Sequence, residues 1–80
     1  MNKYEQIAVE ILESVSEVEG LAEDQELDLF EAGLLDSLSV ISIIIMIENK
    51  LGIRLQPTDF KREDIGTVKE FANFLASKEE

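Results

Sequence analysis

The sequence predicts an all-α fold, a small four-helix bundle of three main helices plus one short helix, with a long loop between helices one and two. Three observations predict it. Apolar residues recur at helical spacing near the N-terminus, an uninterrupted apolar segment lies between two capping residues, and a capping motif precedes a third amphipathic segment. Eighty residues correspond to one small domain, which we expect to comprise residues 1–80.

The first helix is expected at residues 3–17, where apolar residues recur at steps of three and four with glutamates between them. Gly20 follows at a distance suited to marking its end. Residues 19–36 lack periodicity and form the long loop, and loops of this length are usually functional or disordered. This loop carries too many apolar residues for a disordered linker, so we expect Leu27, Phe30 and Leu34 to hold it across the helices.

Residues 37–51 allow two interpretations. The β-branched run at residues 40–47 is compatible with a buried strand. However, fifteen residues without a turn signal are too many for a typical strand, Asp36 is a preferred N-cap, and Gly52 is a preferred residue just past a helix end. We therefore predict a helix.

This second helix has more apolar positions than one buried face can use. One face is spaced for the core and comprises Val40, Ile43, Ile44, Ile47 and Leu51. A second stripe starts beside Ser37 and comprises Leu38, Ile41 and Ile45. We expect the second stripe to be exposed and to bind a partner, because exposed apolar patches mark interaction sites. The alternative is that both faces belong to a tight core.

The C-terminal third contains the remaining helices. Pro57 and Thr58 allow a short helical turn that buries Phe60. Thr67 and Glu70 have the spacing of a capping box and open a final helix at residues 67–77. Its inward residues are expected to be Val68, Phe71, Ala72, Phe74 and Leu75.

Composition excludes several functions. The chain has no histidine and no cysteine, so it lacks the usual general base, the usual zinc ligands and disulfides; we expect no catalytic residues and no resident metal. Its net charge is −11, with eleven acids and one base up to Asp36 and seven acids and six bases after it. This balance argues against nucleic acid and anionic membranes and favours partners with basic patches. No signal peptide or membrane span is visible, so we expect a cytoplasmic protein without stable membrane insertion.

The Asp36–Ser37 pair is informative because of the sequence that surrounds it. Ser37 is expected at a helix N-terminus, where the helix dipole favours a phosphate group. The glutamate-rich first helix, the segment LFEAGLLDSL at residues 29–38 and the segment IENKLGI at residues 47–53 together resemble the acyl carrier protein superfamily over about residues 4–76.

The resemblance implies a carrier and not an enzyme. In that family the serine of the Asp-Ser-Leu motif receives a covalent 4'-phosphopantetheine arm from coenzyme A, and the arm's thiol carries an acyl group as a thioester. Carried over to this chain, Ser37 is the attachment site, Asp36 assists loading through a magnesium ion, and the stripe of Leu38, Ile41 and Ile45 contacts partner enzymes. The implied partners are a phosphopantetheinyl transferase, an acyl- or aminoacyl-loading ligase, and a downstream acyltransferase or synthase. A monomer suits a carrier that visits several enzymes.

The cargo and some alternatives stay open. Residues 58–64 and 30–37 are similar to stand-alone D-alanyl carrier proteins, while specialised polyketide, fatty-acyl, aminoacyl or peptidyl carriers fit as well. One alternative is a non-carrier interaction domain in which Asp36 only caps a helix. A second is calcium binding by acids of the loop, namely Glu23, Asp24, Glu26, Asp28 and Glu31. A third is non-covalent binding of an acyl chain or lipid, which needs a roomy apolar cavity.

Overall fold

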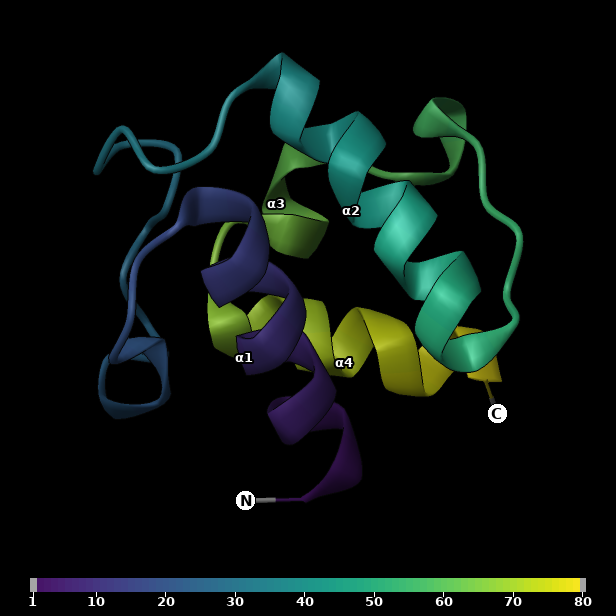
Figure 1. The fold of residues 1–80 in the computed structure, drawn as a ribbon, viewed down its shortest axis with the longest axis horizontal. Helices are drawn as coiled ribbons and strands as arrows, with labels where there is room; N and C mark the ends of the chain where they lie inside the picture. The colour runs from purple at the N-terminus through teal and green to yellow at the C-terminus, as the bar shows by residue number, and fades with distance from the viewer. Residues whose placement is uncertain (1, 80) are drawn as a thin grey trace.

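The computed structural model describes residues 2–79, which contain six helical segments joined by loops (Figure 1). Three are long: α1 (Lys3–Ser16), α2 (Ser37–Leu51) and α4 (Val68–Glu79). The helix α3 (Arg62–Ile65) is short, and two single 3₁₀ turns complete the list, η1 (Leu21–Glu23) and η2 (Pro57–Asp59). The predicted all-α class, with three main helices and a long first loop, is confirmed.

The first helix begins and ends at identifiable caps. The Asn2 side chain accepts a hydrogen bond from the Glu5 N–H at 2.8 Å, and the Glu5 carboxylate accepts one from the Asn2 N–H at 3.5 Å. At the other end Glu17, and not Gly20, adopts the left-handed conformation, with φ 59°. The predicted helix over residues 3–17 is therefore confirmed to within one residue, but Glu17 and not Gly20 ends it. Gly20 lies farther on, before η1, and has φ 86°.

The long loop is packed against the bundle by the predicted residues Leu27, Phe30 and Leu34, and other loop residues are buried more deeply. Leu27, Phe30 and Leu34 are only half-buried, whereas Leu21, Leu29 and Leu35 are buried. Backbone hydrogen bonds also hold the loop in place. Leu29 N–H donates to the Gly66 carbonyl at 2.7 Å, and Lys69 N–H donates to the Gln25 carbonyl at 3.1 Å. These two bonds tie the loop to the start of α4.

The helix α2 has the predicted bounds. Asp36 caps its start, and Gly52, with φ 70°, ends it by donating its N–H to the Glu48 carbonyl. Ile43 and Ile47 are fully buried. The other residues of the predicted core face are half-buried: Val40, Ile44 and Leu51. The helical interpretation of the β-branched run is confirmed.

The C-terminal third differs from the prediction in one element. The turn η2 lies where it was expected, and half-buried Phe60 packs on Phe74 with ring centroids 4.8 Å apart. The short helix α3 was not predicted. Its start is capped by Asp64, which accepts from the Lys61 N–H at 2.8 Å. The helix α4 follows Thr67, whose hydroxyl accepts from the Glu70 N–H at 3.0 Å.

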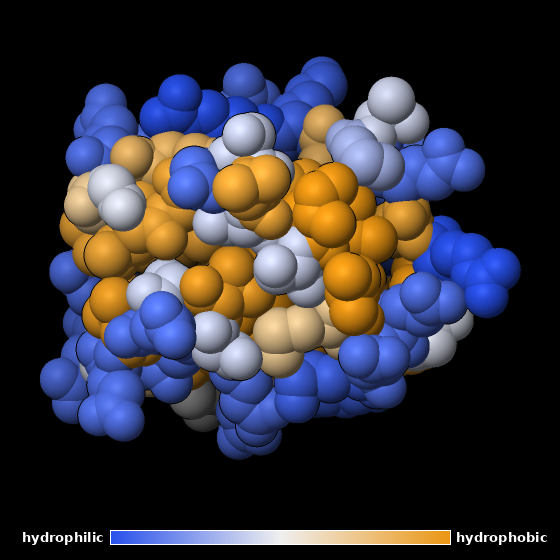
Figure 2. All heavy atoms as spheres, turned by 45° about the horizontal axis from the view of Figure 1, so that its top comes forward, coloured by the Kyte–Doolittle hydropathy of each residue, from blue (hydrophilic) through white to orange (hydrophobic). Residues whose placement is uncertain are grey.

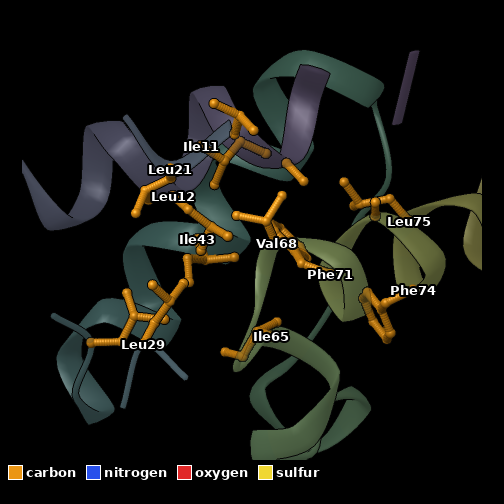
Figure 3. Packing of buried hydrophobic residues seen from close by; sticks show 14 of the residues in the cluster. Ile11, Leu12, Leu21, Leu29, Ile43, Ile65, Val68, Phe71, Phe74 and Leu75 are labelled. Atoms are coloured by element: carbon orange, nitrogen blue, oxygen red, sulfur yellow. The ribbon is translucent and has the colours of Figure 1, made fainter. Parts of the chain in front are cut away.

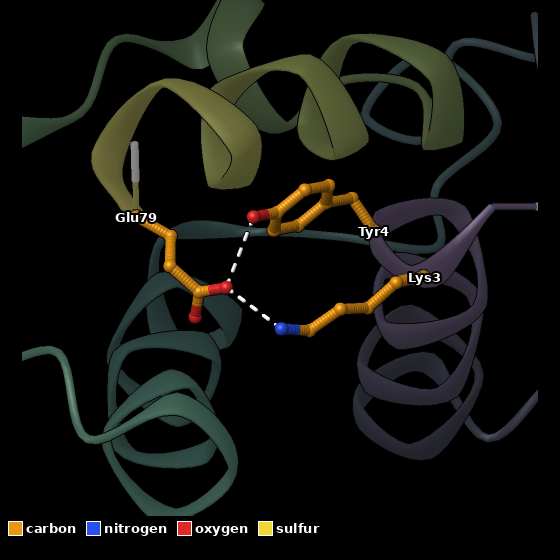
Figure 4. A network of polar contacts seen from close by, with 3 residues as sticks. All are labelled: Lys3, Tyr4 and Glu79. Carbon is orange, nitrogen blue, oxygen red and sulfur yellow. Dashed lines mark hydrogen bonds and ion pairs between the residues drawn. The ribbon is translucent and has the colours of Figure 1, made fainter.

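The three long helices share one core (Figure 3). All five residues predicted to face inward from α4 are buried, and they meet side chains of α1, α2 and the loop, including Ile11, Leu12, Ile43 and Leu29. The two ends of the described chain are also joined (Figure 4). The Glu79 carboxylate accepts from the Lys3 ammonium and from the Tyr4 hydroxyl, both at 2.9 Å. Within residues 2–79 no helix has the length and apolar character needed to cross a membrane.

Candidate functional site at the start of α2

The candidate site is built on the first turn of α2. Ser37 is the first residue of that helix, and its side chain is exposed. Among residues 2–79 no group forms a hydrogen bond with the Ser37 hydroxyl or with its backbone N–H. The hydroxyl is thus accessible on a rigid element, and the free N–H adds to the positive end of the helix dipole.

Asp36 is held in place as the N-cap. Its backbone is extended, with φ −143° and ψ −172°. Its Oδ1 atom accepts from the N–H groups of Leu38 and Ser39, both at 3.0 Å, and from the Ser39 hydroxyl at 3.1 Å. The Ser39 N–H, then the Ser39 hydroxyl and the Leu38 N–H, hold the pKa of the Asp36 carboxyl below its usual range. Asp36 is therefore ionised at neutral pH, next to the free serine.

The long loop before α2 positions Asp36 and Ser37. Leu34 and Leu35 both donate their N–H groups to the Leu29 carbonyl, at 2.9 and 3.2 Å. Leu35 is buried directly before the cap, and the Leu29 N–H is bonded to Gly66 at the junction of α3 and α4. The side chain of Phe30 is covered by the Arg62 guanidinium, 4.7 Å from the ring centroid. The start of α2 therefore depends on contacts from distant parts of the chain.

The predicted second stripe is exposed. We call Leu38, Ile41 and Ile45 the α2 stripe; their side chains are 76 %, 47 % and 53 % exposed, whereas Ile43 and Ile47 on the opposite face have no exposed surface. Figure 2 shows hydrophobic surface gathered on the face of the molecule that carries α2, with hydrophilic residues around it. The stripe thus begins one residue after Ser37 and runs along the helix.

The site fits a covalently attached phosphate ester. Attachment to a serine requires an accessible hydroxyl without a competing internal bond, which Ser37 provides. An anion at this point would lie at the N-terminus of a helix of fifteen residues, where the dipole stabilises negative charge by about 0.3–1 kcal/mol.

The structure gives no support to two alternatives. Among residues 2–79, no group of three or more acidic side chains is placed to hold a metal ion. In the acidic loop, Asp28 instead caps a turn and accepts from the N–H groups of Phe30 and Glu31, both at 3.1 Å. Non-covalent binding of a lipid needs a roomy apolar cavity, and residues 2–79 contain no such cavity.

The sequence interpretation missed the role of Ser39. The Ser39 side chain is half-buried and bonded to both the backbone N–H and the carboxylate of Asp36. The signal was present in the sequence. Ser39 stands at the third helical position after the cap, where capping boxes place a residue that bonds back to the cap.

Comparisons with known proteins agree with this geometry. The family described as "Phosphopantetheine attachment site" matches residues 9–75. The chain is 40 % identical over 70 residues to the D-alanyl carrier protein of Enterococcus faecalis, which covers 88 % of each chain. It is 38 % identical over 71 residues to that of Lactococcus lactis subsp. lactis, covering 89 % of this chain and 90 % of the relative. It is 30 % identical over 73 residues to that of Bacillus velezensis, covering 91 % and 94 %.

These matches span most of the chain and include the exposed serine at the start of α2. They imply a covalently bound 4'-phosphopantetheine and partner enzymes of the transferase and ligase classes. The protein belongs to the acyl carrier protein superfamily, the carriers that bear a phosphopantetheine group.

Proposed function

We propose that Ser37 is the phosphopantetheine attachment site of this carrier and that Asp36 assists its loading. The observation that carries the proposal is the free, exposed hydroxyl of Ser37 at the first residue of α2, directly after an ionised cap. Once attached, the arm supplies a terminal thiol that holds an acyl or aminoacyl group as a thioester. The chain itself presents the cargo, and catalysis is supplied by its partners.

Loading is a phosphoryl transfer to Ser37. The Ser37 oxygen forms a bond to the phosphorus of coenzyme A that bears pantetheine, the bond from that phosphorus to the adenosine bisphosphate part breaks, and the hydroxyl proton passes to a base of the transferase or to water. Asp36, directly before the reacting serine, offers a carboxylate oxygen that has no hydrogen bond within residues 2–79, and such oxygens are the ligands Mg²⁺ prefers. The product phosphodiester remains at the positive end of the helix dipole.

Incubation with coenzyme A, magnesium and a broad-specificity phosphopantetheinyl transferase tests this assignment. Intact mass is expected to increase by one phosphopantetheine, and peptide mapping is expected to place it on Ser37. Ser37→Ala should abolish the addition and keep the fold, because Asp36 still caps α2. Ser14→Ala, a change at an exposed serine of α1, is the control and should be loaded normally. A folded wild-type chain that is not modified would favour a non-carrier interaction domain.

We infer that the cargo is D-alanine. The support is that the relatives compared above, which the chain matches over nearly its whole length, are D-alanyl carrier proteins. The holo-protein, incubated with ATP, D-alanine and a D-alanine-activating ligase, should gain one alanyl group that hydroxylamine removes. Parallel reactions with L-alanine, and with a fatty-acyl ligase and a fatty acid, should give less product. Preferential loading of the fatty acyl group would assign the carrier to a different pathway.

We further propose that the α2 stripe contacts the partner enzymes, a transferase, a loading ligase and a downstream acyltransferase. The stripe is apolar, exposed and contiguous with Ser37, so an enzyme that reaches the arm also reaches these side chains. Because coenzyme A and a loading ligase must meet the carrier, we propose a cytoplasmic location.

A further inference from the structure

The carboxylate of Asp36 is bonded asymmetrically. All three of its hydrogen bonds converge on Oδ1, from the N–H groups of Leu38 and Ser39 at 3.0 Å and from the Ser39 hydroxyl at 3.1 Å. In residues 2–79 no donor is bonded to Oδ2, and the residue is exposed. One oxygen is therefore fixed by the helix, and the other, on the residue directly before Ser37, has no hydrogen bond within residues 2–79.

Ser39 contributes a pair of bonds that few other side chains could make. Its hydroxyl accepts from the Asp36 N–H at 3.1 Å and donates to Asp36 Oδ1 at 3.1 Å. Glutamate is a common residue at this position of a capping box. A glutamate carboxylate could accept from the Asp36 N–H, but it has no proton to donate and would repel the neighbouring carboxylate. The hydroxyl of Ser39 thus connects the backbone of Asp36 to its side chain and restricts the rotation of that side chain.

We propose that Ser39 is a positioning residue for the loading of Ser37: it holds the Asp36 carboxylate with Oδ2 open, on the residue directly before the serine that is modified. This inference rests on the proposed function, because the orientation of Asp36 matters for loading only if Ser37 is the attachment site. A carboxylate that is already oriented needs no ordering when the carrier meets the transferase and Mg²⁺, and preorganised groups of this kind accelerate a reaction.

Three variants separate positioning from stability. Ser39→Ala removes both hydroxyl bonds, Ser39→Thr retains a hydroxyl, and Ser14→Ala changes an exposed serine of α1 that has no bond to Asp36. For each, kcat and KM for transfer from coenzyme A are measured by intact mass. The χ1 angle of Asp36 is measured from its Hα–Hβ three-bond couplings, and the helical circular dichroism signal verifies the fold.

Ser39→Ala is expected to lower kcat/KM about tenfold, the lower end of the usual effect of losing a group that orients a metal-binding side chain. In the same variant Asp36 should average over several χ1 rotamers, and Ser39→Thr should restore both readouts. Normal loading of Ser39→Ala would overturn the proposal, as would slow loading with unchanged couplings or without rescue by threonine. A wild-type chain that is not loaded at all would overturn the proposed function and this role together, a result distinct from a loss confined to Ser39→Ala.

Discussion

At the scale of single residues, Glu17 holds a conformation that favours glycine. Its φ of 59° lies in the left-handed region, where a side chain costs about 1–2 kcal/mol. Replacing Glu17 by glycine removes this cost. Glycine also makes the unfolded chain more flexible, which offsets part of the gain in stability. Glu17→Gly is therefore expected to stabilise the fold by about 0.5–1 kcal/mol in urea unfolding. Glu19→Gly removes the same charge at a residue without positive φ and should not stabilise it; equal gains in both variants would mean that charge is the cause.

Asp36 predicts a pH dependence of stability. Its hydrogen bonds hold the pKa of the folded carboxyl below its unfolded value of about 3.9, so the folded state binds the proton less tightly than the unfolded state. The stability contributed by Asp36 is therefore fully present above about pH 4 and is lost as the pH falls through the folded pKa. Urea midpoints of wild type and Asp36→Asn, measured from pH 7 to pH 2, should converge in acid. Asparagine retains the capping oxygen, so parallel curves would show that the charge contributes nothing.

At the scale of one element, α2 predicts opposite outcomes for two isoleucines two residues apart. Ile47 is fully buried, whereas the Ile45 side chain is 53 % exposed. Ile47→Ala should cost about 2–5 kcal/mol, as truncation in a packed core does, and Ile45→Ala about 1 kcal/mol or less in the same urea titration. Ile45→Asp should then keep the fold while it raises the KM for loading. Unfolding of Ile45→Asp would instead assign Ile45 to the core and leave the docking proposal without support.

How far sequence predicts an element depends on where its stabilising contacts come from. The helices α2 and α4 have local caps at Asp36, Gly52 and Thr67 and periodic apolar faces, so their positions followed from nearby residues. The place of Asp36 and Ser37 at the helix start followed from the same local pattern, whereas their proposed role rests on the resemblance of the longer segments around them to the acyl carrier protein superfamily. By contrast, α3 has only four residues and too little sequence for periodicity to appear.

The arrangement of the loop could not be read from sequence for a different reason. Leu29 is fully buried and Leu27 only half-buried, and the Leu29 N–H is bonded to the carbonyl of Gly66, which is far away in the chain. No local pattern encodes this pairing. The exposure of the α2 stripe was predicted because a small bundle cannot bury both faces of one helix, which is an argument from size and not from contacts.

At the scale of the whole molecule, charge and apolar surface are separated. The acids are concentrated before Ser37, on α1 and the long loop, whereas α2 carries Glu48 as its only acid after the cap. Long-range charge affects mainly how fast and in which orientation partners meet, while apolar contact affects how long they stay together. We therefore expect the acids of residues 1–36, which we call the acidic half, to orient partners as they approach, and the α2 stripe to hold the bound partner.

The same imbalance predicts how salt affects stability. The chain has a net charge of −11, and only three ion pairs occur within residues 2–79, Lys3–Glu79, Lys50–Glu10 and Arg54–Glu48, all near the surface. Surface pairs of this kind contribute little, so repulsion among the acids is the larger effect, and it is greater in the compact state. Raising NaCl from about 0.01 to 0.5 M shortens the screening length several-fold and should raise the thermal midpoint.

Variants at Glu26 test whether this response comes from charge. Glu26 is exposed in the acidic loop, and its side chain makes no hydrogen bond or ion pair to residues 2–79. Glu26→Gln removes one negative charge and Glu26→Lys reverses it. The thermal midpoint at low salt should therefore be higher in Glu26→Gln than in the wild type, and higher still in Glu26→Lys. The dependence of the thermal midpoint on salt should weaken in the same order. KCl should act like NaCl, because screening depends on ionic strength and not on the cation. A midpoint that falls with salt would mean that the three ion pairs outweigh the repulsion of the acidic half.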